Sequence, residues 1–204
     1  MSAREEMLAK VQAALADRPA PQPAPRGYRR SLGDTDVVGL FAERAADYQA
    51  TVRRVSAAEL PDAIAEALRS RSARRIVVPP GLPPVWLTAA DVEPLSDEPP
   101  LAVHDLDQAD GVITGAAVAI ALTGTIILDG GPGQGRRALT LLPDYHVCVV
   151  RTDQVVGTVP EALARLDPSR PQTWISGPSA TSDIELNRVE GVHGPRTLHI
   201  LLVD

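Results

Sequence analysis

The segment from residue 111 to residue 150 constrains the fold most strongly, because its short apolar runs are separated by two glycine-rich turns. Residues 126–128 and 146–150 are β-branched runs bounded by glycine or proline, which is typical of buried strands. The second turn, residues 129–135, is followed directly by two arginines, Arg136 and Arg137. Backbone N–H groups in such a turn can point at a ligand, and the arginines favour an anionic one. The alternative is that the glycines only allow the chain to turn tightly.

Helical and strand-like patterns alternate along the rest of the chain. Helical spacing of apolar residues predicts helices over residues 37–48, 59–70 and 160–166. Further strands are expected over residues 51–55, 75–80, 173–175 and 198–204. Residues 83–87 form a connector or a short helix, and the acidic, proline-broken residues 90–107 are expected at the surface. The alternation predicts an α/β fold with a mainly parallel sheet spanning residues 51–204.

The N-terminal region is expected to be an arm outside this sheet. Ser2 and Glu5 form a capping box at the start of a helix that should run to about Asp17. Four prolines follow between residues 19 and 25, which is typical of an extended, semi-rigid linker. We therefore divide the chain into an arm, residues 1–27, and an α/β domain, residues 28–204. The apolar face of the arm helix must pack on its own domain or on a second copy, so a homo-oligomer is one expectation.

Composition excludes several classes of function. A net charge of −6 argues against nucleic-acid binding, which needs a basic footprint, and 3% aromatic residues leave little for base stacking. The N-terminus has acidic residues and no apolar stretch like that of a signal peptide, and no run reaches membrane-spanning length. We expect a cytoplasmic protein. Cys148 is the only cysteine, so the chain alone cannot supply the thiolates of an iron–sulfur cluster, and Cys148 is expected in the core.

Polar residues concentrate at predicted strand ends in the second half of the chain. Ligands of open parallel sheets bind beyond the carboxyl ends of strands, so these residues are expected to border one concave surface that binds a small anion. The expected set is Thr123, Gly124, Thr125, Arg136, Ser176, Gly177, Ser179 and Thr181. The alternative for Ser179 and Thr181 is that they cap a helix that starts near Asp183.

Catalytic residues are not fixed by the sequence. His193 lies in a glycine- and proline-flanked loop, and Asp183 and Glu185 follow a serine-rich turn, which makes all three candidates. The four histidines and Cys148 lack metal-ligand spacing, so no metal site is expected. The serine-hydrolase elbow, the Walker loop and the dinucleotide-binding glycine pattern are all absent.

Four stretches together resemble the LUD-domain family, in particular its lactate utilization protein C group. They are ALTGTIIL, GG-G-RRALTLLPDYHVCVV, ISGPSATSDIE and GVHGPRTLHILLVD, and they lie between Gly115 and Asp204. The resemblance implies a Rossmann-like sheet similar to that of the sugar-phosphate isomerase and coenzyme A transferase group. It also implies a role in oxidising L-lactate to pyruvate, beside two iron–sulfur partner proteins. Family members often carry an acidic residue just before the TGT turn, where this chain has Leu122.

The absence of a cofactor motif agrees with that role only if the redox centres lie elsewhere. Removing two electrons from lactate requires a flavin, a nicotinamide or a metal centre. We therefore expect a non-redox subunit that binds no cofactor, with iron–sulfur clusters on its partners. Two alternatives are a stand-alone enzyme of isomerase or transferase type acting on a small anion, and a sensor that binds a small carboxylate or phosphate.

Overall fold

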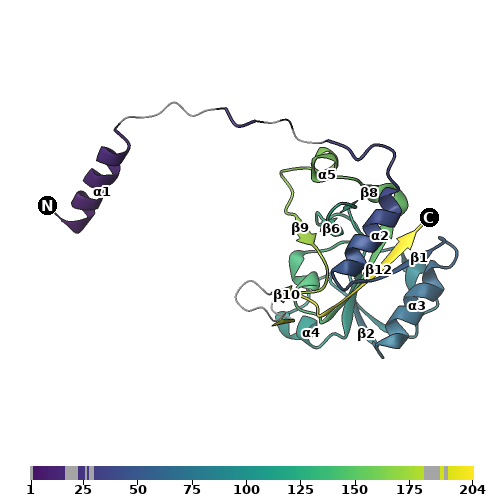
Figure 1. Cartoon of the computed structure of the whole chain (residues 1–204). Coiled ribbons are helices and arrows are strands. Elements are labelled where there is room, and N and C mark those ends of the chain that lie inside the picture. Colours follow the sequence, from purple (N-terminus) through teal and green to yellow (C-terminus); the bar gives the residue numbers. More distant parts are fainter. Residues whose placement is uncertain (1, 17–22, 26, 28–29, 182–188, 191–192) are drawn as a thin grey trace.

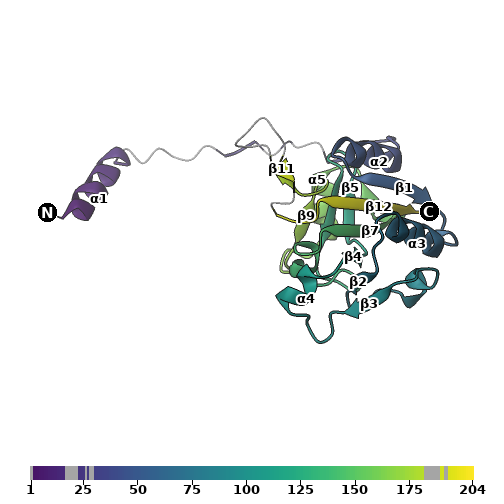
Figure 2. The same ribbon diagram turned by 90° about the horizontal axis from the view of Figure 1, so that it is seen from below.

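The computed structural model describes residues 2–16, 23–25, 27, 30–181, 189–190 and 193–204. Its centre is a six-stranded parallel sheet in the order β1-β12-β7-β4-β2-β3 (Figures 1 and 2). The strands are β1 (Thr51–Val55), β12 (Thr197–Val203), β7 (Tyr145–Arg151), β4 (Gly111–Thr114), β2 (Arg75–Val78) and β3 (Glu93–Ser96). The prediction of an α/β fold with a parallel sheet over residues 51–204 is confirmed.

Both faces of this sheet are buried, which explains why its central strands are apolar throughout. Successive residues of β7 alternate between the faces, so Val147 and Val149 pack on one side and Cys148 and Val150 on the other. The helix α3 (Leu60–Ser70) and the 3-10 helix η1 (Pro84–Leu87) cover the first side. The helix α2 (Val37–Asp47) covers the second side, and Asp36 caps it by accepting a hydrogen bond from Gly39 N–H at 3.0 Å.

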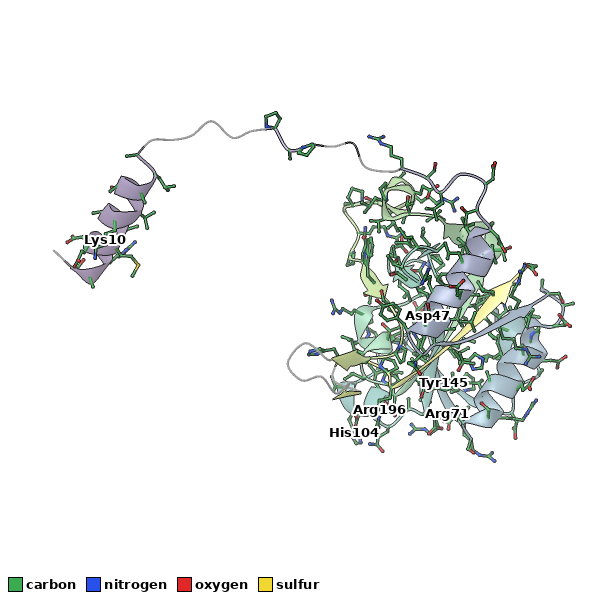
Figure 3. The ribbon with its side chains drawn as sticks, viewed as in Figure 1. Lys10, Asp47, Arg71, His104, Tyr145 and Arg196 are labelled. Carbon is green, nitrogen blue, oxygen red and sulfur yellow. The ribbon has the colours of Figure 1, made fainter. Side chains whose placement is uncertain are left out.

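Tyr145 fixes α3 to the first face of the sheet. Its hydroxyl donates to the carbonyl oxygen of Ala67 in α3 at 3.1 Å, and the Arg71 guanidinium lies 5.9 Å from the ring centre (Figure 3). Burial raises the pKa of Tyr145 to about 12, so the phenol stays protonated.

A second, smaller sheet covers the other face together with α2. Its order is β8 (Val155–Val156), β5 (Val118–Ile120), β6 (Thr125–Leu128) and β9 (Thr173–Ile175), and β6 is antiparallel to both of its neighbours. The helix α5 (Val159–Arg165) packs on its outer side. The sequence assigned residues 126–128 and 173–175 to the parallel sheet, and that assignment is wrong. The short turn at Gly124 joins β5 to β6 as a hairpin, which forces antiparallel pairing.

The acidic segment 90–107 is more regular than its prolines suggested. It contains β3 and the short helix α4 (Val103–Asp107). Pro94 is tolerated because β3 is an edge strand, where a missing N–H leaves no ladder partner unsatisfied. The remaining short elements are η2 (Arg137–Thr140), η3 (Thr152–Gln154), β10 (Ala180–Thr181) and β11 (Val189–Glu190).

The N-terminal helix is α1 (Ala3–Ala14). Ser2 Oγ accepts from Glu5 N–H at 3.3 Å, and the Glu5 carboxylate accepts from Ser2 N–H at 2.7 Å, which completes the capping box. The helix buries none of its residues and stands apart from the body of the protein (Figure 2). Among the described residues, no helix is long and apolar enough to cross a membrane.

Gly124 offers a test of how the small sheet is held in place. Its φ is +59°, and an added Cβ would lie 2.6 Å from the backbone of Arg44 and Ala45 in α2. Gly33 has a similar φ of +64° but open space around it. Gly124→Ala should therefore lower the melting temperature clearly more than Gly33→Ala, which adds only backbone strain of about 1–2 kcal/mol. Equal losses in thermal unfolding would show that the contact with α2 does not matter.

Candidate functional site

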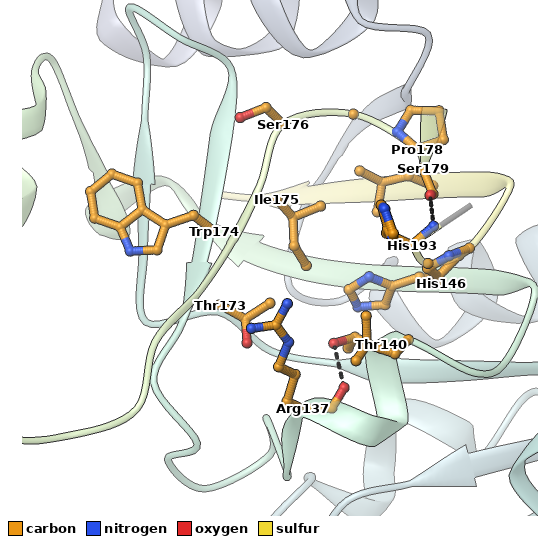
Figure 4. Close-up of a pocket in the computed structure, with 15 residues that line it drawn as sticks. Arg137, Thr140, His146, Thr173, Trp174, Ile175, Ser176, Pro178, Ser179 and His193 are labelled. Atoms are coloured by element: carbon orange, nitrogen blue, oxygen red, sulfur yellow. Dashed lines mark hydrogen bonds between the residues drawn. The ribbon is translucent and has the colours of Figure 1, made fainter. Parts of the chain in front are cut away.

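A cavity of about 230 Å³ lies between the large sheet and β9, at the amino ends of β7 and β12. Its wall is formed by η2, the first residues of β7 and β12, the strand β9 with the turn that follows it, and the loop of residues 193–195 (Figure 4). The sequence analysis expected the site beyond carboxyl ends of strands. For the parallel sheet that expectation is wrong, because β9 and its turn extend over the amino ends and enclose space there.

His146 is the buried polar group of this cavity. It is the second residue of β7, is 1% exposed, and its Nε2 lies 2.8 Å from Thr114 Oγ1. Burial lowers the pKa of His146 to about 4, so the imidazole is neutral at pH 7. A neutral imidazole carries one donor and one acceptor nitrogen, and can therefore serve a hydroxyl or a carbonyl group.

Arg137 supplies positive charge to the same cavity. It is the first residue of η2, and Figure 4 shows its guanidinium directed toward the space that the His146 ring faces. Within the part of the chain that the structure describes, the Arg137 side chain makes no hydrogen bond or ion pair. Thr140, one helical turn later, lines the cavity and donates its hydroxyl to the Arg137 carbonyl at 3.3 Å. A guanidinium placed in this way can bind a carboxylate through two parallel hydrogen bonds.

Arg136, which the sequence analysis grouped with the anion-binding residues, points elsewhere. It donates from Nε and Nη2 to the two oxygens of Asp97, each at 2.9 Å, and to the Leu101 carbonyl at 2.7 Å. Burial would raise the pKa of Asp97, but the hydrogen bonds from Arg136 and from Leu101 N–H outweigh it and hold the pKa below its usual range. The two arginines diverge because η2 begins between them: Arg136 is its extended N-cap residue and Arg137 its first residue.

The TGT turn contacts the cavity only through Ser176. Thr125 Oγ1 lies 2.7 Å from Thr123 Oγ1 and 2.8 Å from Ser176 Oγ, which forms a chain of three hydroxyls. Ser176 and Gly177 line the cavity, whereas Thr123, Gly124 and Thr125 do not. Gly177 has a φ of +81°, and a Cβ added there would lie 2.5 Å from the Tyr48 carbonyl oxygen. A Cβ added at Gly124 would be equally close to the backbone of Arg44 and Ala45. Both glycines are thus explained by close packing on the C-terminal part of α2.

Ser179 and His193, which the sequence analysis treated separately, lie next to each other. Ser179 Oγ accepts a hydrogen bond from His193 N–H at 2.8 Å, and Ser179 N–H donates to the Pro195 carbonyl at 2.8 Å. Both residues line the cavity. Thr181 lies in β10, its side chain is not among those described, and Asp183 and Glu185 lie outside the described residues. The catalytic candidacy of His193, Asp183 and Glu185 stays a prediction.

The glycine-rich turn of residues 129–135 does not form an anion cradle. Its amides are used within the protein: Asp129 N–H donates to Gln134 Oε1 at 2.6 Å, Gly131 N–H to Asp129 Oδ1 at 3.0 Å, and Gly133 N–H to Pro80 at 2.8 Å. The structural alternative for these glycines is therefore the correct one.

Among the side chains with polar groups that line the cavity, sequence reasoning did not include Arg137, Thr140, His146, Thr173 and Trp174. The sequence indicated that both arginines favour an anion but placed only Arg136 in the expected set, and it placed His146 at the start of a buried strand. His146 is indeed buried, but it also borders the cavity. Among the described residues, no group of three or more His, Cys, Asp or Glu side chains could hold a metal ion. Cys148 is fully buried, and burial raises the pKa of its thiol to about 12.

The parallel sheet and its covering layers define a Rossmann-like α/β protein. The LUD domain model matches residues 101–203, and the chain belongs to this family. It is 52% identical to lactate utilization protein C of Deinococcus radiodurans, over 98% of this chain and 95% of the relative. It is 30% identical to lactate utilization protein C of Halalkalibacterium halodurans, over 82% of this chain and 80% of the relative.

A solved structure has the same fold. The crystal structure of a DUF162 family protein from Deinococcus radiodurans is 48% identical, with a TM-score of 0.69. The match covers 82% of this chain and 96% of that one.

Removing the side chain of Arg136 should destabilise the protein, whereas removing that of Arg137 should not. Arg136→Ala leaves the buried Asp97 carboxylate without its partner and should lower the free energy of unfolding by about 2–4 kcal/mol. This value already allows for the partial exposure of Arg136 to water, which weakens the ion pair. Arg137→Ala should change it by less than about 0.5 kcal/mol. Urea unfolding of the two variants measures both values. Similar losses in both would contradict the assignment of separate roles.

His146 should make stability depend on pH. Its pKa is about 4 in the folded protein and about 6.5 when unfolded, so the unfolded state binds more protons between these values. Stability is complete above pH 6.5 and falls as pH drops toward 4, by roughly 2 kcal/mol between pH 7 and pH 5. His146→Gln should remove this part of the pH dependence. The matched control is exposed His104→Gln, which should leave it unchanged; an unaltered profile for His146→Gln would refute the prediction.

Proposed function

We propose that this protein acts in cytoplasmic lactate utilization, as a subunit that binds a small carboxylate in the cavity beside Arg137. The redox centres that accept electrons from lactate are then carried by iron–sulfur partner proteins. Support comes from the family, whose relatives in Deinococcus radiodurans and Halalkalibacterium halodurans are named lactate utilization protein C.

The single observation that carries the proposal is the pairing of one cation with one neutral, buried imidazole in a small cavity. Arg137 suits a carboxylate, and His146 with Thr140 suits a neighbouring hydroxyl or carbonyl oxygen. L-lactate and pyruvate have this arrangement of groups on adjacent carbons. The volume of about 230 Å³ is smaller than the roughly 300–1,000 Å³ of sites for drug-sized ligands, which favours a molecule of this size.

The chemistry of the chain supports placing the redox centres on partner proteins and substrate binding on this chain. Oxidation of a 2-hydroxy acid releases two electrons and two protons, and the electrons need a flavin, nicotinamide or metal acceptor. The only cysteine is buried in the core as a protonated thiol, so this chain cannot supply a four-thiolate cluster. A subunit that orients the substrate, while clusters on its partners take the electrons, meets both conditions.

Arg137 is the residue through which the proposal is tested. In calorimetric titrations, Arg137→Gln should weaken binding of L-lactate or pyruvate by tenfold or more, that is by at least about 1.4 kcal/mol. Its melting temperature should stay at that of the natural protein. Arg69→Gln, at the end of α3 on the other side of the sheet, is the matched control and should bind normally. Binding of neither acid by the natural protein, or equal binding by Arg137→Gln, would refute the proposed site.

A further inference from the structure

A second cavity lies at the opposite end of the sheet, and the function proposed above does not involve it. The sheet order sends the chain from β2 outward to β3, and from β4 the other way to β7. The connections therefore change direction between β2 and β4. Beyond the carboxyl ends of such a strand pair, α/β proteins commonly bind their ligands.

The glycine-rich turn of residues 129–135 occupies the space beyond β2 and β4, so the cavity lies beside this turn. Gly133 N–H donates to the Pro80 carbonyl after β2, and Gly115 N–H after β4 donates to the Gly133 carbonyl, both at 2.8 Å. Next to this plug, a cavity of about 510 Å³ opens at the carboxyl ends of β4 and β7. Its lining includes Ala116, just after β4, and Arg151, the last residue of β7.

Three arginines from separate segments border this cavity: Arg151 from β7, Arg165 from the end of α5, and Arg170 from the segment before β9. Each is held in place. Arg151 bonds to the Asp153 carboxylate at 3.0 Å, Arg165 donates to the Asp153 carbonyl at 2.8 Å, and Arg170 pairs with Asp129 at 2.9 Å. A guanidinium has five N–H donors, and these contacts use only one or two of each.

The charge of the lining is positive in an acidic protein. Three arginines face two aspartates, Asp129 and Asp153, which gives 3 − 2 = +1 for the cavity, against −6 for the chain. Arg165 donates to a carbonyl oxygen and not to a carboxylate, so this contact does not neutralise its charge. Guanidinium groups held in position with spare donors suit a phosphate, whose several oxygens accept hydrogen bonds from different directions.

We propose that this cavity is a second anion site, and that it binds a phosphate-bearing small molecule through Arg151, Arg165 and Arg170. The ligand differs in chemistry from the small carboxylate proposed for the first cavity, and the two sites are on opposite ends of the sheet. The second site therefore does not depend on the function proposed above.

The test is calorimetric titration of the full chain with inorganic phosphate and with pyrophosphate at low ionic strength. Pyrophosphate should bind saturably with one site per chain, and Arg165→Gln should weaken it by about tenfold or more. Arg69→Gln is the matched control and should bind pyrophosphate normally, because Arg69 lies at the end of α3 and lines neither cavity. Arg165→Gln leaves both aspartate pairs intact, so its fold is expected to survive, which thermal unfolding verifies.

Several results would overturn this proposal. They are absence of saturable pyrophosphate binding, equal affinity of the natural protein and Arg165→Gln, and a loss of binding in Arg69→Gln. Citrate serves as the carboxylate counterpart: binding of citrate but not of pyrophosphate would contradict the phosphate class. None of these outcomes bears on lactate binding at Arg137, so the two proposals fail separately.

Discussion

The close approach of two glycine turns to α2 is the contact on which the rest of the structure depends. Gly124 and Gly177 both have positive φ, and both lie against the backbone of α2 or its last turn with no room for a Cβ. These contacts hold β6 and the turn after β9 against the layer that covers the large sheet. The cavity exists because β9 is held there, above the first residues of β7 and β12. The close packing of Gly124 and Gly177, which have no functional side chain, thus positions the wall of the candidate site.

The adjacent arginines Arg136 and Arg137 have different electrostatic partners and therefore different roles. Arg136 is committed to a buried carboxylate and stabilises the fold, while Arg137 faces the cavity with its donors available among the described residues. The same distinction applies to the two buried groups on β7 that can titrate. Burial keeps His146 neutral and useful as a hydrogen-bonding group, and keeps Cys148 as an unreactive thiol. Local environment, and not residue type, decides which of these side chains can meet a ligand.

The sequence predicts the large sheet well because buried parallel strands are continuous β-branched runs, as in β7 and β12, and such runs need no long-range information. It could not predict which sheet a three-residue run joins, so β6 and β9 were placed wrongly. It placed Ser176, Gly177 and Ser179 in one expected set, and all three line the cavity. It chose Arg136 and not Arg137 for the anion site, because the directions of the two side chains depend on where η2 starts, which the sequence pattern does not show. Nor could it show that His146 borders a cavity, because the wall opposite comes from β9, which is remote in sequence.

The central claim is that this chain binds the carboxylate while its partners take the electrons. The most direct measurement is the visible absorbance of iron–sulfur partner proteins mixed with L-lactate, with and without this chain, together with the pyruvate formed. The account predicts that lactate bleaches the clusters and yields pyruvate only when the chain is present, and that the isolated chain forms no pyruvate. Pyruvate formation by the chain without partners, or equally fast cluster reduction in its absence, would contradict the account.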